Sequence, residues 1–183
     1  GVALTNSSGA YGVAIAEYVM AGVLELMRCL PAYIGQQRRH EWRRLGFTRS
    51  IMGSRVTVIG LGDLGGNVAM RMKAFGAHVT GVRRSAGPPP DCVDELVPAG
   101  RVDAALEGAD VVVLCLPNTP DTRHMLTAQR IARLKDGAVV VNVGRGSAID
   151  QPALLSALQS GRLLGAVLDV VEKEPLPADD PLW

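Results

Sequence analysis

A glycine-rich turn is the first stretch of this sequence whose residue types and spacing indicate chemistry. The apolar run Val56–Ile59 leads into Gly60-x-Gly62-x-x-Gly65, and a helical pattern follows over residues 67–75. In such a unit the first glycine permits a tight turn, the second lets the backbone approach a ligand, and the third allows close helix–strand packing. The free N–H groups and dipole of the helix then favour an anion such as a pyrophosphate. Because this motif also occurs in other α/β proteins, the rest of the chain has to identify the ligand.

The remaining elements predict a parallel sheet. The candidate strands are continuous apolar runs separated by helical stretches, which is typical of strands buried on both faces. We therefore predict an α/β fold, a Rossmann-type doubly wound parallel sheet in a three-layer αβα sandwich. The predicted strands are Arg55–Ile59, His78–Val82, Glu95–Val97, Val111–Leu116, Ala138–Asn142 and Leu164–Leu168, and the predicted helices are Val13–Leu30, Asn67–Phe75, Val102–Leu106, a helix from a Thr127 cap to about Leu134, and Gln151–Gln159 after an Asp150 cap.

Composition and charge exclude several classes of protein. Hydrophobic residues make up 48% and charged residues 20% of the chain, as expected for a globular protein, and the formal charge of +1 gives no argument for nucleic acid. Glu17, Glu25 and Arg28 interrupt the apolar run 13–30, which favours a buried helix over a membrane span. The three cysteines are scattered without a C-x-x-C pair, so we expect reduced thiols and a cytoplasmic protein. No spacing typical of metal ligands is present.

The ends of the chain suggest a longer protein. The sequence begins at Gly1 and stops at Trp183, just after a proline-rich turn, so we expect a piece of a larger chain. We divide it into residues 1–50, a long helix and connector, and residues 51–183, a dinucleotide-binding core. Asn6, Ser7 and Ser8 are candidate caps for the first helix.

A basic cluster over residues 38–44 has two interpretations. It could contact nucleic acid, or it could be a solvated connector with Trp42 docked on the domain. The near-zero net charge and the lack of a second basic patch favour the connector.

Chemically active residue types follow the predicted strands. Ligands of an open parallel sheet bind beyond the carboxyl ends of its strands. Glycine, polar or charged residues stand at this point after five strands, which is more specific than one glycine motif. These residues are Gly60 to Gly65, then Arg83, Arg84 and Ser85, then Pro117, Asn118 and Thr119, then Val143, Gly144, Arg145 and Gly146, and finally Asp169.

Arg83 indicates which dinucleotide would bind. It stands about 20 residues beyond the glycine motif, where an acidic residue normally binds the ribose 2′-OH of NAD. Two guanidinium groups, Arg83 and Arg84, and the Ser85 hydroxyl would instead bind a 2′-phosphate. We therefore predict that NADP is preferred and NAD is possible. The alternative is a pair of surface arginines flanking a loop.

Several motifs together resemble the D-isomer-specific 2-hydroxyacid dehydrogenases. The most specific are Asn142-Val143-Gly144-Arg145-Gly146 and Asp169-Val170-Val171-Glu172-Lys173-Glu174-Pro175. Ala16-Glu17, Leu116-Pro117-x-Thr119-x-x-Thr122 and Gly165–Val170 also match, in family order, over nearly the whole chain. In this family the cofactor domain is inserted within a substrate domain. The resemblance implies that this chain is the cofactor domain alone.

The resemblance assigns catalytic roles to two residues. Arg145 resembles the arginine that holds the substrate carboxylate and polarises the keto oxygen, although a capping or salt-bridging arginine is the alternative. Glu174 resembles the carboxylate that bonds the catalytic histidine and keeps it protonated, while we expect Glu172 to be an exposed charge.

The resemblance also implies the cofactor contacts. Asp169 would bind the nicotinamide carboxamide, backbone groups of Asp63 and Leu64 would meet the pyrophosphate, and Leu116 and Pro117 would border the adenosine. The expected cofactor-binding residues are Gly60, Gly62, Asp63, Leu64, Gly65, Arg83, Arg84, Ser85, Leu116, Pro117, Thr122, Val143, Gly144 and Asp169.

The catalytic histidine is the main departure from the family pattern. The family carries it in a Pro-His motif downstream of Glu-Pro, beyond Trp183. We do not assign this role to His40, His78 or His124, although the family often has an unreactive histidine at the last of these positions.

Two hypotheses follow for function. The first is the cofactor domain of an enzyme that transfers hydride between NAD(P)H and a 2-keto or D-2-hydroxy acid. The second is a dinucleotide-sensing co-regulator on the same scaffold. A 3-hydroxyacid dehydrogenase would not explain Arg145 and Glu174 together. The resemblance implies a homodimer, to which the apolar helix 13–30 could contribute, although core packing explains that helix equally well.

Overall fold

The computed structural model describes residues 2–3, 5, 7, 9–46, 48–85 and 87–183. Within these residues six strands form one sheet in the order β3-β2-β1-β4-β5-β6, and each neighbouring pair is parallel. The order reverses at β1, as in the doubly wound folds predicted from the sequence. The strands are β1 (Arg55–Ile59), β2 (His78–Arg83), β3 (Glu95–Pro98), β4 (Val111–Leu114), β5 (Ala138–Asn142) and β6 (Leu163–Leu168).

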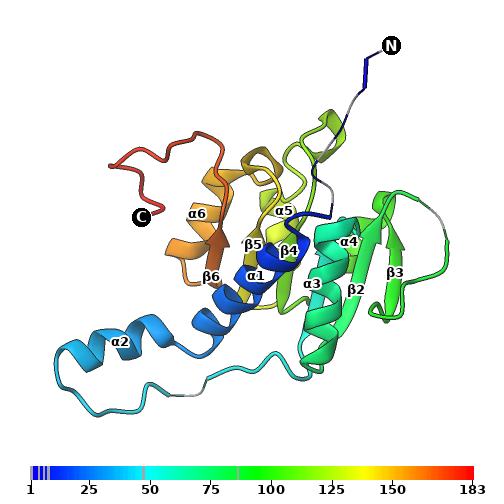
Figure 1. The fold of residues 1–183 in the computed structure, drawn as a ribbon. Coiled ribbons are helices and arrows are strands. Elements are labelled where there is room, and N and C mark those ends of the chain that lie inside the picture. The colour runs from blue at the N-terminus through cyan, green and yellow to red at the C-terminus, as the bar shows by residue number, and fades with distance from the viewer. Residues whose placement is uncertain (1, 4, 6, 8, 47, 86) are drawn as a thin grey trace.

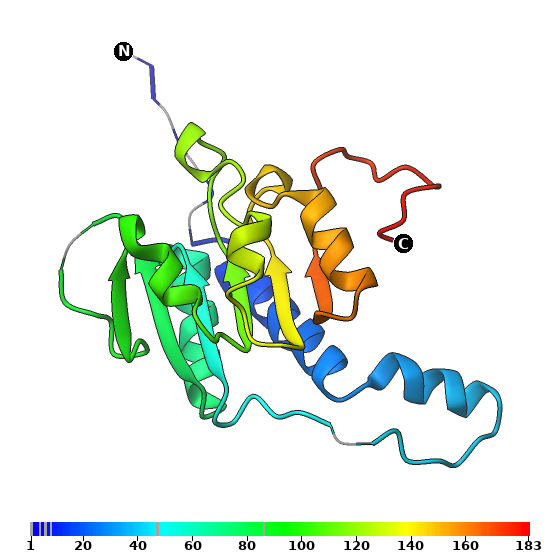
Figure 2. The same ribbon diagram turned by 180° about the vertical axis from the view of Figure 1, so that it is seen from behind.

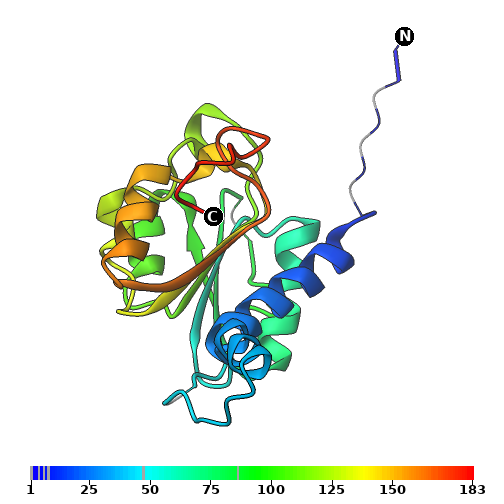
Figure 3. The ribbon, with the colours of Figure 1, turned by 90° about the vertical axis from the view of Figure 1, so that its left-hand side faces the viewer.

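Helices cover both faces of this sheet and make the three-layer sandwich (Figures 1, 2 and 3). Side chains of β4 alternate between the layers: Val111 and Val113 join the core under α1 and α3, whereas Val112 and Leu114 join the core on the opposite face. This double burial explains the continuous apolar runs in the sequence. The helices are α1 (Gly12–Met27) and α3 (Asp63–Ala74) on one face and α4 (Val102–Leu106), α5 (Ala128–Ile131) and α6 (Gln151–Gln159) on the other, with α2 (Leu30–Arg38) beyond α1 and short 3-10 turns η1 (Ala99–Arg101), η2 (Pro120–Thr122) and η3 (Gly146–Ala148).

The single helix predicted over Val13–Leu30 is wrong. α1 ends at Met27, Cys29 has a left-handed backbone (φ 56°), and α2 begins at Leu30 with Pro31 in its first turn. A proline has no N–H, and its ring would clash with the Met27 carbonyl in a continuous helix, so the chain breaks and Pro31 starts a new helix instead of ending the old one. The Met27 carbonyl accepts a hydrogen bond from the Arg49 N–H at 2.9 Å.

The connector after α2 also differs from expectation. Trp42 was predicted to dock on the domain, but its side chain is fully exposed. Figures 1 and 2 show why: α2 and the chain that follows it project away from the sheet before returning to β1. The returning chain is held by Arg49, which donates to the carbonyls of Gly137 (2.5 Å) and Asp136 (3.1 Å).

Other boundaries differ by a few residues. α3 begins at Asp63 instead of Asn67, because Gly62 has the extended backbone of an N-cap and the helix starts at once. β4 ends at Leu114 and not Leu116, and α5 ends at Ile131 and not Leu134. Thr127 and Asp150 cap α5 and α6 as predicted.

The N-cap residue of α1 makes no side-chain capping bond. Of the candidate caps, Asn6 and Ser8 lie outside the described residues, and Ser7 is not the cap, because the N-cap of α1 is Tyr11, whose side chain makes no capping bond. Within the described residues no helix is long and apolar enough to span a membrane.

The layer formed by α4 and β4 gives a stability prediction. Leu106 is fully buried in the second core, so Leu106→Ala should lower the free energy of unfolding by about 2–5 kcal/mol, through lost burial and the cavity left behind. Leu164 on β6 is 39% exposed, and Leu164→Ala should cost less than about 1.5 kcal/mol. Urea unfolding of both variants measures the difference. Equal losses would contradict this assignment of the core.

Candidate functional site

A cleft of about 720 Å³ opens at the carboxyl ends of β1, β2 and β4. It lies at the point where the strand order reverses, because crossovers leave β1 toward both edges of the sheet and leave the space above it open. Eight of the predicted site residues line it: Gly60, Gly62, Arg83, Arg84, Ser85, Leu116, Pro117 and Thr122.

The three positions of the turn hold glycine for different structural reasons. A Cβ at Gly60 would lie 2.6 Å from the Cys115 carbonyl oxygen, and a Cβ at Gly65 would overlap the Gly60 carbonyl oxygen. No protein atom lies within 4 Å of a Cβ placed at Gly62. Packing therefore requires Gly60 and Gly65, whereas Gly62 faces open space that a ligand would fill.

The remaining turn residue, Leu61, packs against β2. Its Cδ1 would lie 2.5 Å from a Cβ at Gly81, so the absent side chain of Gly81 makes room for it. This contact fixes the height of the turn above the sheet.

The first turn of α3 is free to bind an anion. Its N-cap, Gly62, offers no side-chain acceptor, in contrast to Thr127 on α5 and Asp150 on α6. The predicted backbone donors Asp63 and Leu64 lie in this turn, next to the cleft instead of in its lining. Uncapped N–H groups and the helix dipole together favour negative charge there.

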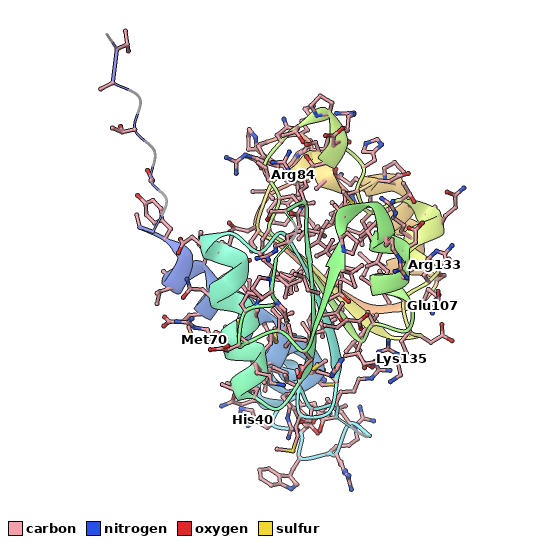
Figure 4. All side chains as sticks on the ribbon, turned by 90° about the vertical axis from the view of Figure 1, so that its right-hand side faces the viewer. His40, Met70, Arg84, Glu107, Arg133 and Lys135 are labelled. Atoms are coloured by element: carbon pink, nitrogen blue, oxygen red, sulfur yellow. The ribbon has the colours of Figure 1, made fainter. Side chains whose placement is uncertain are left out.

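The arginines after β2 have different roles. Arg83 donates through Nε to the Ser85 carbonyl (3.0 Å) and through one terminal nitrogen to the Pro88 carbonyl (3.0 Å), so it holds the loop to which it belongs. Arg84 is exposed and makes no hydrogen bond or ion pair with the described residues. Figure 4 labels it near the edge of the sheet where the cleft opens. Arg84 is therefore the cation available to a ligand.

The loop after β4 is organised by Thr122. Its hydroxyl donates to the Pro117 carbonyl (2.6 Å) and accepts from the Thr119 N–H (2.9 Å), which makes η2 a compact turn. Thr122 thus lines the cleft while its hydroxyl bonds its own loop. Burial raises the pKa of the Cys115 thiol to about 12, so this cleft residue is not a nucleophile at neutral pH.

Other lining residues were missed from the sequence. Arg130 reaches the cleft from α5 and is held by Asp103 (2.7 Å) and by the Met125 carbonyl (2.7 Å). The hydrogen bond from Arg130 lowers the pKa of Asp103. No motif marks Arg130, because it reaches the cleft only through the folding of α5 against the sheet. The missed residues are Ala99, Gly100, Cys115, Asp121, Met125 and Arg130.

The turn after β5 presents Arg145 to solvent. Asn142 is 1% exposed, donates to the Arg145 carbonyl (2.9 Å) and accepts from the Gly144 N–H (3.2 Å). A Cβ at Gly144 would lie 2.5 Å from the Leu116 carbonyl oxygen, so this turn packs directly on the chain that borders the cleft. The exposed Arg145 side chain bonds only the Gly144 carbonyl (2.7 Å) among the described residues. The predicted residue Val143 is buried beneath it.

Asp169 and Glu174 line a second cavity, of about 480 Å³, with Pro175, Leu182 and Trp183. The Asp169 N–H donates to the Asn142 carbonyl (3.0 Å), which joins the ends of β5 and β6. Glu174 accepts from the Val171 N–H (3.1 Å). Arg145 lines neither cavity, so the structure brings Asp169 and Glu174 together and leaves Arg145 on the neighbouring turn.

Glu172 does more than the exposed charge expected from the sequence. Its carboxylate pairs with Arg123 (3.1 Å) and lies 3.9 Å from His124 Nε2. The His124 N–H donates to the Ser147 carbonyl (2.8 Å). These contacts join the loops after β4, β5 and β6 along one edge of the molecule.

Comparisons with known proteins agree with this geometry. Residues 20–183 match the family described as D-isomer specific 2-hydroxyacid dehydrogenase, NAD binding domain. The chain is 36% identical to D-3-phosphoglycerate dehydrogenase of Methanocaldococcus jannaschii, covering 100% of this chain and 35% of that protein.

Solved structures superpose closely as well. A family protein from Aeromonas salmonicida has a TM-score of 0.86 at 40% identity, over 98% of this chain and 56% of that one. A D-isomer specific 2-hydroxyacid dehydrogenase of Xanthobacter autotrophicus, solved with NADPH and MES, has a TM-score of 0.86 at 36% identity, over 97% and 56%. The chain thus spans between a third and just over half of the length of these relatives.

The glycines give a paired prediction. Gly62 has φ −77°, which alanine adopts freely, so Gly62→Ala should keep the melting temperature but weaken dinucleotide binding about tenfold or more, because the methyl group occupies the ligand's space. Gly65→Ala should instead cost at least about 1–3 kcal/mol of stability through its clash with the backbone. Thermal unfolding and calorimetric titration separate the two. Unchanged binding by Gly62→Ala would show that the open space is not the ligand's.

Proposed function

The chain belongs to the D-isomer specific 2-hydroxyacid dehydrogenases, as their NAD-binding domain, and from this premise we propose that it holds NADP(H) for hydride transfer between the nicotinamide and the C2 position of a 2-keto or 2-hydroxy acid. The observation that carries the proposal is the cleft that joins the open space at Gly62 to Arg84 and Ser85. The dinucleotide would lie across the switch point, with its pyrophosphate at the N-terminus of α3.

The preference for NADP rests on charge at the end of β2. Arg83, Arg84 and Ser85 line the cleft where NAD enzymes place a ribose-binding carboxylate. Arg83 keeps the loop in place and still has unused N–H donors, while Arg84 has no partner among the described residues. A guanidinium pair binds a phosphate dianion well. The NADPH complex of the Xanthobacter relative, at 36% identity, supports this choice.

The reacting end would lie toward β5 and β6. Asp169 would bind the carboxamide of the nicotinamide, and Arg145 would hold the substrate carboxylate and polarise its carbonyl. Glu174 would bond a histidine supplied by the whole protein, which would protonate the new alkoxide. The substrate domain would come from chain outside these residues. Residues 51–183 would form the dinucleotide-binding core, with α1 packed on one face of its sheet and α2 with the chain after it as the attachment.

We further propose a homodimer formed through the hook made by α2 and residues 39–46. The hook surrounds a hollow of about 660 Å³. Its lining combines the aromatic residues Tyr33 and Trp42 with the polar and charged residues Gln36, Gln37, His40, Glu41, Arg43 and Arg44. Trp42 is fully exposed, Ile34 is 45% exposed, and the buried Gln36 Nε2 has no hydrogen-bond partner among the described residues. A second copy would cover the exposed side chains of Trp42 and Ile34. The three unpaired thiols of Cys29, Cys92 and Cys115 suit a cytoplasmic protein.

Arg84 gives the sharpest test of the cofactor. Arg84→Ala should raise the dissociation constant for NADPH about 10- to 100-fold and change that for NADH less than about threefold, because only NADPH carries the 2′-phosphate. Arg133→Ala, which removes an arginine on the α5 side of the sheet, is the matched control and should change neither (Figure 4). Calorimetric titration of both nucleotides measures the constants. Tighter NADH than NADPH binding by the unchanged chain would reject the NADP preference, and binding of neither would reject the function.

Trp42 tests the dimer. Sedimentation of the unchanged chain should give twice the 19.3 kDa chain mass, and Trp42→Ala should weaken association about 30-fold or more, as expected for a buried aromatic anchor. Met70→Ala, which removes an exposed apolar side chain outside the hook, serves as the control. A chain that sediments as a monomer at every concentration would rule out this interface.

A further inference from the structure

The Asp63 side chain leaves the glycine-rich turn and reaches the segment that enters α1. The Gly9 N–H donates to Asp63 Oδ2 at 3.1 Å, across 54 positions of sequence. Gly12, the first residue of α1, lies so close that a Cβ there would be 2.5 Å from the same oxygen. Asp63 is therefore part of the glycine-rich turn through its backbone and contacts the start of α1 through its carboxylate.

α1 lacks an anion of its own at this end. Its N-cap, Tyr11, makes no side-chain bond, and its first turn contains no acidic residue. A carboxylate at a helix N-terminus stabilises the helix by meeting its free N–H groups and its dipole. Asp63 supplies that charge from α3.

Further contacts continue this connection along the two helices. Asn67 Nδ2 lies 3.3 Å from Asp63 Oδ1, and Asn67 Oδ1 accepts from Arg71 at 3.1 Å. Arg71 lies 3.7 Å from Glu17 of α1. Residues spaced by four on one face of α3 thus link the turn to α1.

The position of this carboxylate conflicts with a bound pyrophosphate. It lies in the first turn of α3, whose N–H groups would meet the phosphates, and like charges repel. A bound dinucleotide would disfavour every Asp63 rotamer that turns toward the cleft and would leave the one that bonds Gly9. Ligand binding and the order of the segment Gly9–Gly12 would then favour each other.

We propose that Asp63 is a positioning residue that couples occupancy of the pyrophosphate site to the order of the segment Gly9–Gly12, at a cost in dinucleotide affinity. The inference rests on the proposed dinucleotide site and deepens it. In a whole protein with the proposed substrate domain, this segment would lead into the cofactor domain. The order of the connection between the domains would thus depend, through the Asp63 carboxylate, on whether the cofactor is bound.

Two variants separate the charge from the hydrogen bond. Asp63→Asn keeps an oxygen for the Gly9 N–H but removes the charge, so it should bind NADPH and NADH about 3- to 10-fold more tightly, both alike because both carry the pyrophosphate. Asp63→Ala removes the acceptor as well. Glu107→Gln, which removes one negative charge beyond α4, is the control and should leave both affinities unchanged.

Amide exchange measured by NMR on the 183-residue chain tests the coupling. NADPH should slow exchange of the Gly9–Gly12 amides severalfold in the unchanged chain, and at saturating NADPH it should change exchange little in Asp63→Asn and Asp63→Ala, because neither variant carries the charge that the pyrophosphate repels. The same slowing in Asp63→Ala, or none in the unchanged chain despite NADPH binding, would overturn the coupling.

A gain in affinity by Glu107→Gln equal to that of Asp63→Asn would also overturn it, because it would trace the effect to overall charge. Absence of any dinucleotide binding would instead reject the proposed function, and this inference with it. Should Asp63→Ala fail to fold, the amide exchange of Asp63→Asn decides the coupling and its affinity decides the cost of the charge.

Discussion

The site depends on the close approach of three backbone segments above β1. Gly60 lies against the Cys115 carbonyl, and Gly65 lies against the Gly60 carbonyl, so the end of β1, the end of β4 and the start of α3 leave no room for side chains between them. Parallel pairing of β1 with β4 in the buried core brings the segments together. The cleft exists because the chain then departs in opposite directions from this contact.

Around this contact, several residues of the predicted motifs hold their own loops in place. Arg83, Thr122, Asn142 and Glu174 each bond the backbone of their own loop. The loops are therefore ordered before a ligand arrives, which lowers the cost of binding. The Arg84 side chain, by contrast, is exposed and has no hydrogen-bond partner among the described residues, and the exposed Arg145 side chain bonds only the neighbouring Gly144 carbonyl among them. A family motif can thus contain both kinds of residue, and only the contacts distinguish them.

Local patterns predicted most of the sheet and the cleft, and failed where long-range packing decides. Buried strands such as Ala138–Asn142 and the cap Asp150 were predicted because apolar runs and capping residues act locally. Pro31 was misassigned because a proline both ends a helix and starts one, and sequence alone does not choose. Trp42 was predicted to dock on the domain, yet its side chain is fully exposed, because α2 and the chain after it project away from the sheet. Arg130 was missed because only the folded chain brings it to the cleft.

The contact between Leu61 and Gly81 has a consequence for the evolution of this site. The Leu61 side chain occupies the volume that a side chain at position 81 would need, so the two positions share one fixed space. Among relatives their sizes should vary inversely, and an alanine at 81 should be tolerated only with a smaller residue at 61. A change deep in β2 would otherwise lift the turn that carries Gly62 and alter cofactor affinity without touching the cofactor.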